Sequence, residues 1–327
     1  MRFALWALMV SVISIGQASA QVRLAASPFS TYVDYEGEPS RLSAIVQEAF
    51  ERMEIPVDVQ ILRPAFLGSG LSAGKLDGEF AFIDFNDRNS QFIYSDGYLP
   101  FYLYAANRNQ NVSDIRLMPH LKDNRVAIEN RFVNTGKMRL LKQVKWSRNP
   151  SAYDAFKQLA DGRAPYLMTT RLLAEEFNRL LMIGKGTRLY LSGAPLLKGH
   201  FYLTLSKNYT NAESVIVSFN SAIQQMQADG SYNRILGVPW LSKDINGDGV
   251  AELIASSKTL HPELTKERAL LAFPLDDSTI GDSSTFIIDG VTQPDWPSAQ
   301  AALDSATIGE RPSLLDEEVY DTMIKRW

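Results

Sequence analysis

Hydrophobic residues recur along most of the chain at the spacing of helices or of strands. After Ser40, a set of apolar residues falls on one face at helical spacing and predicts a helix that Pro56 ends. The members of that set are Leu42, Ile45, Val46, Ala49, Phe50 and Met53. Residues 57–62 are apolar at alternate positions, which predicts a strand. The first strong elements are therefore a helix and the strand that follows it.

The same two patterns alternate through residues 22–240. Short buried-type strands are predicted at 22–26, 57–62 and 79–85, with helices between them. A second series covers residues 108–195 and includes a cationic helix at 135–143 and a helix that starts at Thr170 and continues to 181. Strand and helix in alternation predict an α/β fold with a mostly parallel sheet. After Trp240 the periodicity weakens, so residues 241–327 are expected to form an appendage.

In such a sheet, ligands gather at the carboxyl ends of the strands. Four residues of the first part are placed at such ends: Phe29, Asp84, Asn86 and Arg88. Arg88 stands in an aromatic-rich run, where it is either a solvated turn residue or a guanidinium that binds a ligand carboxylate through two hydrogen bonds. These residues make this edge of the sheet the first candidate site.

Residues 1–20 have the pattern of a secretory signal peptide. Arg2 is followed by an apolar run and then by Ala18, Ser19 and Ala20, which suit a cleavage site. No cysteine follows, so a lipoprotein is not expected, and the protein should be released into the periplasm from Gln21. The chain has no cysteine at all, which excludes disulfides and thiolate metal sites. Its net charge of −4 does not favour nucleic acid or an anionic membrane as the partner. Direct membrane insertion after cleavage is not expected, because no later run is long and apolar enough to cross a membrane.

Several short motifs occur in one order along residues 22–240. They are Gly74-Lys75-Leu76-Asp77, Arg88 followed by the run 93–98 (IYSDGY), the run 121–128 (LKDNRVAI), the run 159–163 (LADGR) and the run 223–235 (IQQMQADGSYNRI). Together they resemble extracellular solute-binding protein family 3, the periplasmic solute-binding proteins of the polar amino-acid type. The resemblance implies a two-lobed, type II periplasmic-binding-protein-like α/β fold with two crossover strands.

The resemblance also implies an organisation and a function. Lobe 1 is expected at residues 21–101 and 200–240, lobe 2 at 102–199, and a C-terminal extension at 241–327. A small polar or anionic solute would bind in the cleft between the lobes and pass to an ABC transporter or a membrane sensor. In the family, the arginine at the position of Arg88 binds the ligand α-carboxylate, and an aspartate binds the α-ammonium. Here that aspartate is replaced by Thr170.

A buried ammonium without a carboxylate partner is costly, so an α-amino acid is not the expected ligand. Arg88 and Arg131 together favour a carboxylate or another anion. Phe29 and Tyr32 are expected to line the pocket with aromatic faces, next to Asp84, Asn86 and Thr170.

A second motif lies in the extension, at residues 244–254 (DINGDGVAELI). Oxygen-bearing side chains alternate around a glycine turn, and this suits Ca²⁺. The predicted ligands are Asp244, Asn246, Asp248, the carbonyl of Val250, and Glu252. The run resembles the calcium loops of integrin-like propeller repeats and of dockerins, although Ala255 replaces the glutamate of a full EF-hand. The alternative is a plain Asn/Gly/Asp turn, and a bound Ca²⁺ would act as a structural clip.

Two other functions stay open. An enzyme on the same fold, similar to cyclohexadienyl dehydratases, would need a general acid or base, for which Glu129 and Asp84 are the candidates. A scaffold that has lost its ligand site and carries a Ca²⁺-clipped extension is the third alternative. The three histidines are far apart and no Ser-His-Asp or phosphate-loop pattern is present, so binding is expected rather than catalysis.

Overall fold

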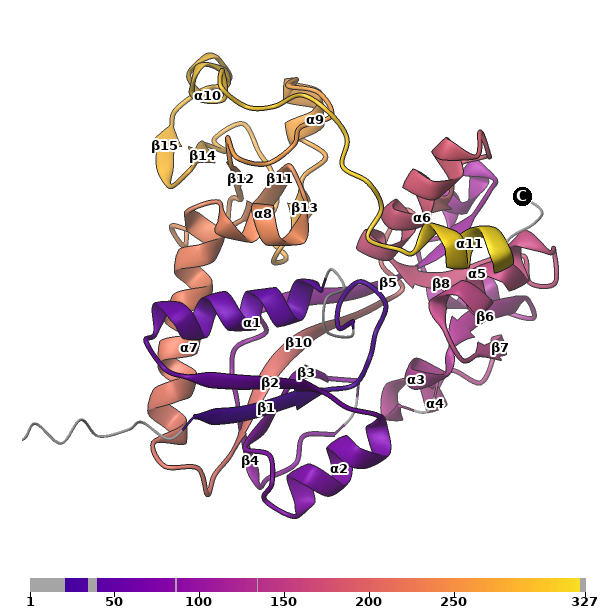
Figure 1. The fold of residues 1–327 in the computed structure, drawn as a ribbon. Coiled ribbons are helices and arrows are strands. Elements are labelled where there is room, and N and C mark those ends of the chain that lie inside the picture. Colours follow the sequence, from indigo (N-terminus) through magenta and orange to yellow (C-terminus); the bar gives the residue numbers. More distant parts are fainter. Residues whose placement is uncertain (1–20, 35–39, 86, 134, 324–327) are drawn as a thin grey trace, which may run out of the picture.

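The computed structural model describes residues 21–34, 40–85, 87–133 and 135–323. The predicted signal peptide and Asn86 lie outside these ranges. Figure 1 shows two α/β parts joined by long strands, with a third part above the first. None of the helices in the described ranges is long and apolar enough to cross a membrane.

The main sheet runs through both α/β parts. Its order is β2-β1-β3-β10-β5-β8-β6-β7, with β4 paired to β10 and β9 paired to β5. The bounds are β1 Val22–Ala26, β2 Val57–Ile61, β3 Gly78–Ile83, β4 Phe92–Tyr94, β5 Leu99–Asn107, β6 Arg125–Glu129, β7 Lys145–Asn149, β8 Tyr166–Thr170, β9 Tyr190–Leu191 and β10 Leu197–Ser206. The pairs β1–β2, β1–β3, β6–β7 and β6–β8 are parallel. We call the part with β1–β3 lobe 1 and the part with β6–β8 lobe 2.

The antiparallel strands β5 and β10 connect the lobes. β10 pairs with β3 of lobe 1 and with β5, and β5 pairs with β8 of lobe 2. The helices pack around this sheet, with α1 against α7 and α8 in lobe 1. Their bounds are α1 Arg41–Arg52, α2 Pro64–Ser72, α3 Asn130–Val133, α4 Gly136–Arg139, α5 Ala152–Ala160, α6 Arg171–Ile183, α7 Ala212–Ala228 and α8 Ser231–Leu236, with 3₁₀ turns at Gln110–Asp114 and Met118–Leu121.

The C-terminal extension is folded around a sheet of its own, in the order β13-β11-β12-β14-β15. Its elements are β11 Trp240–Lys243, β12 Glu252–Ala255, α9 Lys266–Ala269, β13 Phe273–Pro274, β14 Phe286–Ile288, β15 Val291–Gln293 and α10 Trp296–Ala302. Trp240, Phe286 and Leu303 belong to its small buried core. The chain then returns to lobe 2, where α11 (Glu317–Met323) packs on α5 (Figure 1).

A large hydrophobic core continues from lobe 1 into lobe 2. One cluster of buried residues contains Leu24 and Phe80 of lobe 1 together with Val126 and Met168 of lobe 2. Burial of apolar surface is the main force that stabilises a fold. The lobes therefore meet through packed side chains, and this contact sets the geometry of the candidate site.

Candidate ligand site between the lobes

The candidate site lies where strands of both lobes end. β1 is followed by Phe29 and Tyr32, β3 by Asp84, and β6 by Arg131, while Thr170 is the last residue of β8 and the N-cap of α6. The carboxyl ends of the parallel strands are the usual ligand-binding edge of an α/β sheet. The structure thus brings residues of both lobes to one place.

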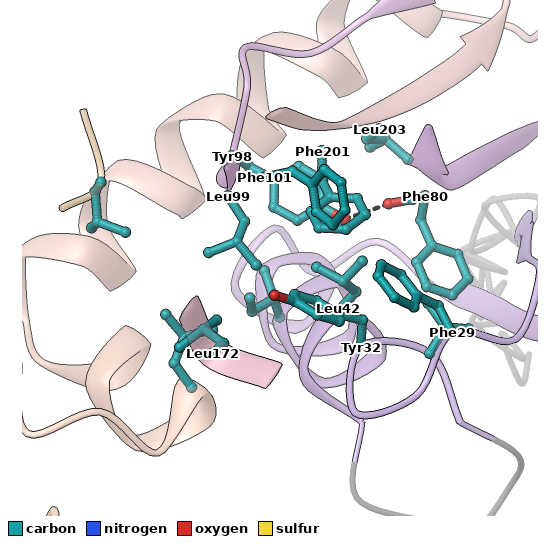
Figure 2. Packing of buried hydrophobic residues seen from close by; sticks show 14 of the residues in the cluster. Phe29, Tyr32, Leu42, Phe80, Tyr98, Leu99, Phe101, Leu172, Phe201 and Leu203 are labelled. Atoms are coloured by element: carbon teal, nitrogen blue, oxygen red, sulfur yellow. Dashed lines mark hydrogen bonds between the residues drawn. The ribbon is translucent and has the colours of Figure 1, made fainter. Parts of the chain in front are cut away.

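Tyr32 connects the lobes directly. Its hydroxyl lies 2.8 Å from the Oγ1 atom of Thr170, and both side chains are buried. Burial raises the pKa of Tyr32 to about 12, so its hydroxyl stays neutral at physiological pH. The ring stacks on that of Phe29, with centroids 4.6 Å apart. Figure 2 shows both residues among the buried side chains of this region.

The aromatic packing fills the space between the lobes. Phe29 contacts the rings of Phe101, Phe132 and Phe201, with centroids 5.6 to 6.2 Å apart. Beside Tyr32 and Thr170 remains a cavity of about 10 Å³. That volume holds roughly one water molecule. A solute at this position would therefore require the lobes or the rings to move.

Arg131 reaches from lobe 2 to lobe 1. Its guanidinium lies 4.4 Å from the centroid of the Phe29 ring and donates a hydrogen bond to the carbonyl of Pro28. Its Nε atom is 3.3 Å from the carboxylate of Glu129. A guanidinium carries five N–H donors, so Arg131 keeps hydrogen-bonding capacity for an anion.

Glu129 is buried at the end of β6. Burial raises the pKa of this carboxyl to about 7, although the charge of Arg131 and its hydrogen bond to Glu129 oppose the effect. A carboxyl that titrates near neutrality is often found at functional sites. Glu129 is thus a second polar group of the site. From the sequence it is named only as a candidate general acid or base.

Asp84 lies at the rim, between the lobes. Its Oδ1 atom accepts a hydrogen bond from the backbone N–H of His200 at 3.0 Å, and Lys137 of lobe 2 is 3.7 Å from Oδ2. The backbone N–H of Lys137 also donates to the carbonyl of Phe85 at 3.3 Å. Neither Lys137 nor His200 was singled out from the sequence, because no local motif marks them.

Arg88 has a different environment. Its guanidinium lies 4.8 Å from the ring centroids of Tyr94 on β4 and of Tyr202 on β10, and the residue is exposed. In contrast, Phe29, Tyr32, Arg131 and Thr170 are linked by contacts to one another. A role of Arg88 as a carboxylate ligand stays a prediction, and Asn86 lies outside the described residues.

The predicted calcium loop forms a hydrogen-bonded turn. The carboxylate of Asp244 accepts from the backbone N–H groups of Gly247 at 2.6 Å and Gly249 at 2.8 Å. Glu252 is buried and accepts from the N–H of Ile245 and the side-chain amide of Asn246. Within the described ranges, no group of three or more His, Cys, Asp or Glu side chains is arranged to hold a metal ion. Calcium binding therefore stays a prediction.

Comparison of the structure with solved structures shows which fold this is. The ligand-binding core of GluR0 in complex with L-glutamate aligns with a TM-score of 0.54 and 10% identity, over 64% of this chain and 95% of that core. The fold is that of the two-lobed periplasmic-binding proteins. An amino-acid ABC transporter substrate-binding protein from Streptococcus pneumoniae, bound to L-arginine, aligns with a TM-score of 0.50 and 15% identity, over 66% and 92% of the two chains.

The VFT2 domain of Bordetella pertussis BvgS has the same TM-score of 0.50, with 16% identity, over 66% of this chain and 91% of the domain. No protein-family model and no curated protein matches the sequence. The strands β5 and β10 connect the two lobes, so the contacts of Tyr32, Arg131 and Asp84 join one lobe to the other.

Proposed function

We propose that the protein binds a small polar or anionic solute between its lobes and delivers it to a membrane transporter or sensor. Three contacts between the lobes carry the proposal: Tyr32 with Thr170, Asp84 with Lys137, and Phe29 with Arg131. Each contact crosses between two lobes that two strands connect. Such lobes move as hinged bodies around a ligand.

The chemistry of these groups supports an anion. Arg131 and Lys137 supply hydrogen-bond donors from lobe 2, although Glu129 and Asp84 lie 3.3 Å and 3.7 Å from them and offset part of their charge. The hydroxyls of Tyr32 and Thr170 supply neutral donors and acceptors. Thr170 cannot neutralise an ammonium group, so the solute we propose carries a carboxylate or similar group without a required α-ammonium. Arg88 is the second anion contact that we propose, because it is exposed and, among the described residues, its guanidinium lies against rings and forms no ion pair.

The filled cleft favours a second candidate, a scaffold that binds no solute. The aromatic contacts of Phe29 and the cavity of about 10 Å³ describe lobes whose facing side chains are packed against one another. An enzymatic function is the third candidate, and it would rest on Glu129 as the acid or base. Secretion to the periplasm rests on residues 1–20, and a mature N-terminus at Gln21, determined by mass spectrometry, would test it.

The deciding experiment is a thermal-shift screen with carboxylates, other anions and amino acids, followed by calorimetric titration of each hit. If a solute binds between the lobes, it should stabilise the protein in the screen. Its affinity, measured by titration, should fall at least about tenfold in Arg131→Gln, because a charge-assisted hydrogen bond is lost. Arg139→Gln, which removes an exposed arginine of α4, is the matched control. Arg88→Ala tests the role predicted from the sequence.

If none of the compounds stabilises the protein, the solute-binding proposal fails and the scaffold remains. Conversion of a bound acid, detected by mass spectrometry of the mixture and lost in Glu129→Gln, would favour the enzyme.

A further inference from the structure

A cavity of about 290 Å³ lies outside the interlobe site, between lobe 2 and the C-terminal extension. Three segments form most of its walls, and Arg188, between α6 and β9, completes them. α6 contributes residues from Arg171 to Met182, the connection into β11 contributes Gly237 to Trp240, and the extension contributes residues from Leu260 to Leu271 and Gly309 to Arg311. The volume is close to the lower end of the range of small-molecule sites, roughly 300 Å³.

The charges around this cavity are mainly positive. Five arginines and three glutamates line it: Arg171, Arg179, Arg188, Arg268, Arg311, Glu175, Glu263 and Glu310. Arg171 is paired with Glu175 at 2.9 Å, and Arg268 with Glu263 at 3.3 Å. Arg311 is bonded to Glu176, which lies behind the wall. Three of the five guanidiniums are thus neutralised locally.

The remaining two arginines, Arg179 and Arg188, are available to a ligand. The nearest carboxylate to Arg179 belongs to Glu176, 3.8 Å away, and that carboxylate already binds Arg41 and Arg311. Arg188 is exposed and makes no ion pair with the other described residues. Burial and the neighbouring charge of Arg311 lower the pKa of Arg179, while the charges of Glu176, Glu175 and Glu310 oppose the shift.

Two residues of the wall also hold hydrogen-bond donors that are not used. The Nε atom of Arg179 and the Nε1 atom of Trp240 are buried and have no hydrogen-bond partner among the described residues. Both atoms are donors only. A buried donor without a partner is costly, but these two atoms lie behind the cavity surface. The rest of the Arg179 side chain is 21% exposed, and an anion in the cavity would contact that part of the guanidinium.

The rim of the cavity adds apolar surface. Met182, Leu260 and Leu271 line it and are exposed, Met182 and Leu271 each by 61%. Apolar side chains beside a few charged groups are typical of sites for small organic ligands.

We propose that this cavity binds a small organic anion, a carboxylate or a phosphate ester with an apolar body, through Arg179 and Arg188. The apolar body lies against Leu260, Leu271 and Met182. Because the walls belong to α6 and to the extension, the bound anion joins lobe 2 to the extension. The proposal does not depend on solute binding between the lobes.

Calorimetric titration of the purified protein with benzoate, phenyl phosphate and inorganic phosphate tests it. We expect benzoate or phenyl phosphate to bind, and Arg179→Gln and Arg188→Gln each to weaken that binding at least about tenfold, the loss of one charge-assisted hydrogen bond. Arg63→Gln, an exposed arginine ahead of α2, is the matched control and should bind as the unmodified protein does. Arg188 is exposed, so its variant keeps the test valid if Arg179→Gln does not fold.

Comparison of the two aromatic probes separates the carboxylate from the phosphate ester. The proposal is overturned if none of the probes binds, or if both cavity variants bind the probes as tightly as the unmodified protein does, which would mean an adventitious ion only. Binding that is lost in Arg131→Gln but kept in Arg188→Gln would place the anion between the lobes and also overturn it. If binding is weakened in Arg179→Gln and Arg188→Gln but not in Arg131→Gln, the result supports this cavity and does not bear on solute binding between the lobes.

Discussion

The guanidinium of Arg41 lies 2.5 Å from the carboxylate of Glu176, and both side chains are buried. Arg41 belongs to α1 of lobe 1 and Glu176 to α6 of lobe 2, so this ion pair crosses between the lobes. Arg311 contacts the same carboxylate, and the backbone N–H of Leu314 donates to it at 2.9 Å. One glutamate therefore joins both lobes and the returning C-terminal segment.

Removal of this charge should destabilise the protein strongly. In Glu176→Gln the guanidiniums of Arg41 and Arg311 lose their common partner, and breaking a buried ion pair costs about 3–5 kcal/mol. The free energy of unfolding, from urea denaturation, measures the loss. The matched control is Asp277→Asn, which breaks the pair of Lys198 and Asp277.

That control pair has the same separation of 2.5 Å but is exposed by 50% and 72%. An exposed pair contributes less than about 1 kcal/mol. Similar losses in both variants would mean that burial does not set the strength of the Arg41–Glu176 contact.

Acid should weaken the same contact. Although burial opposes the effect, the hydrogen bonds and charges of Arg311 and Arg41 lower the pKa of Glu176 to about 2. The unfolded chain then binds a proton below pH of about 4.5, where the folded protein does not. Stability is therefore fully present above that pH and is lost as the pH falls toward 2, by up to about 3 kcal/mol.

Urea denaturation between pH 6 and pH 3, with Glu176→Gln beside the unmodified protein, checks this dependence. The variant has no carboxylate at this position, so its stability should fall less steeply with acid. Parallel curves for the two proteins would contradict the assignment.

The sequence predicted the elements with strong periodicity and missed those that tertiary contacts decide. The helix after Ser40 is present as α1, with Leu42 and Ile45 buried, and Thr170 caps α6. The predicted helix at 135–143 is wrong, because α4 covers only Gly136–Arg139. The N–H of Lys137 donates to Phe85 of the other lobe, a contact that local pattern cannot indicate.

The extension shows the same limit. Its strands are two to four residues long. Alternation of apolar and polar residues cannot be recognised over so few positions, so the sheet was not expected. In the site, Phe29, Tyr32 and Thr170 are brought together, as the order of strand ends suggests. The orientation of Arg88 and the pairing of Arg41 with Glu176, 135 residues apart, depend on packing and leave no mark in the local sequence.

Tyr32→Phe should loosen the interlobe contact without creating a cavity. The variant keeps the ring on Phe29 but loses the hydrogen bond to Thr170, so we expect a loss of about 1 kcal/mol in the free energy of unfolding. Thr170 keeps its bond to the N–H of Leu173 at 3.2 Å, so α6 should remain capped. Tyr166→Phe on β8, whose hydroxyl makes no hydrogen bond within the described ranges, is the control. A larger loss in the control would show that the hydroxyl bond contributes nothing.

Glu129 should produce the opposite pH dependence to Glu176. Burial raises the pKa of Glu129 from 4.5 to about 7, so between these values the folded protein binds a proton that the unfolded chain has released. This contribution lowers stability as the pH rises from about 4.5 to 7, by up to about 3 kcal/mol. Glu129→Gln removes this contribution. The free energy of unfolding of the variant should therefore fall less between pH 5 and pH 8 than that of the unmodified protein. Glu213→Gln, at an exposed position of α7, should leave the profile unchanged, and a flat profile in the unmodified protein would refute the raised pKa.

Calcium remains to be tested at the loop from Asp244 to Glu252. The carboxylate of Asp244 now accepts from the N–H groups of Gly247 and Gly249, and it would turn toward a bound ion. An ion that binds only the folded state raises the melting temperature as its concentration increases. We expect Ca²⁺ to stabilise the protein, EDTA to reverse the effect, and Asp248→Asn to abolish it, because that change removes a ligand charge and keeps an acceptor oxygen for the N–H of Val250. Asp282→Asn, an exposed acidic position of the extension, is the control. The same melting temperature in Ca²⁺ and in EDTA would leave the loop as a turn held by the hydrogen bonds of Asp244, Asp248 and Glu252.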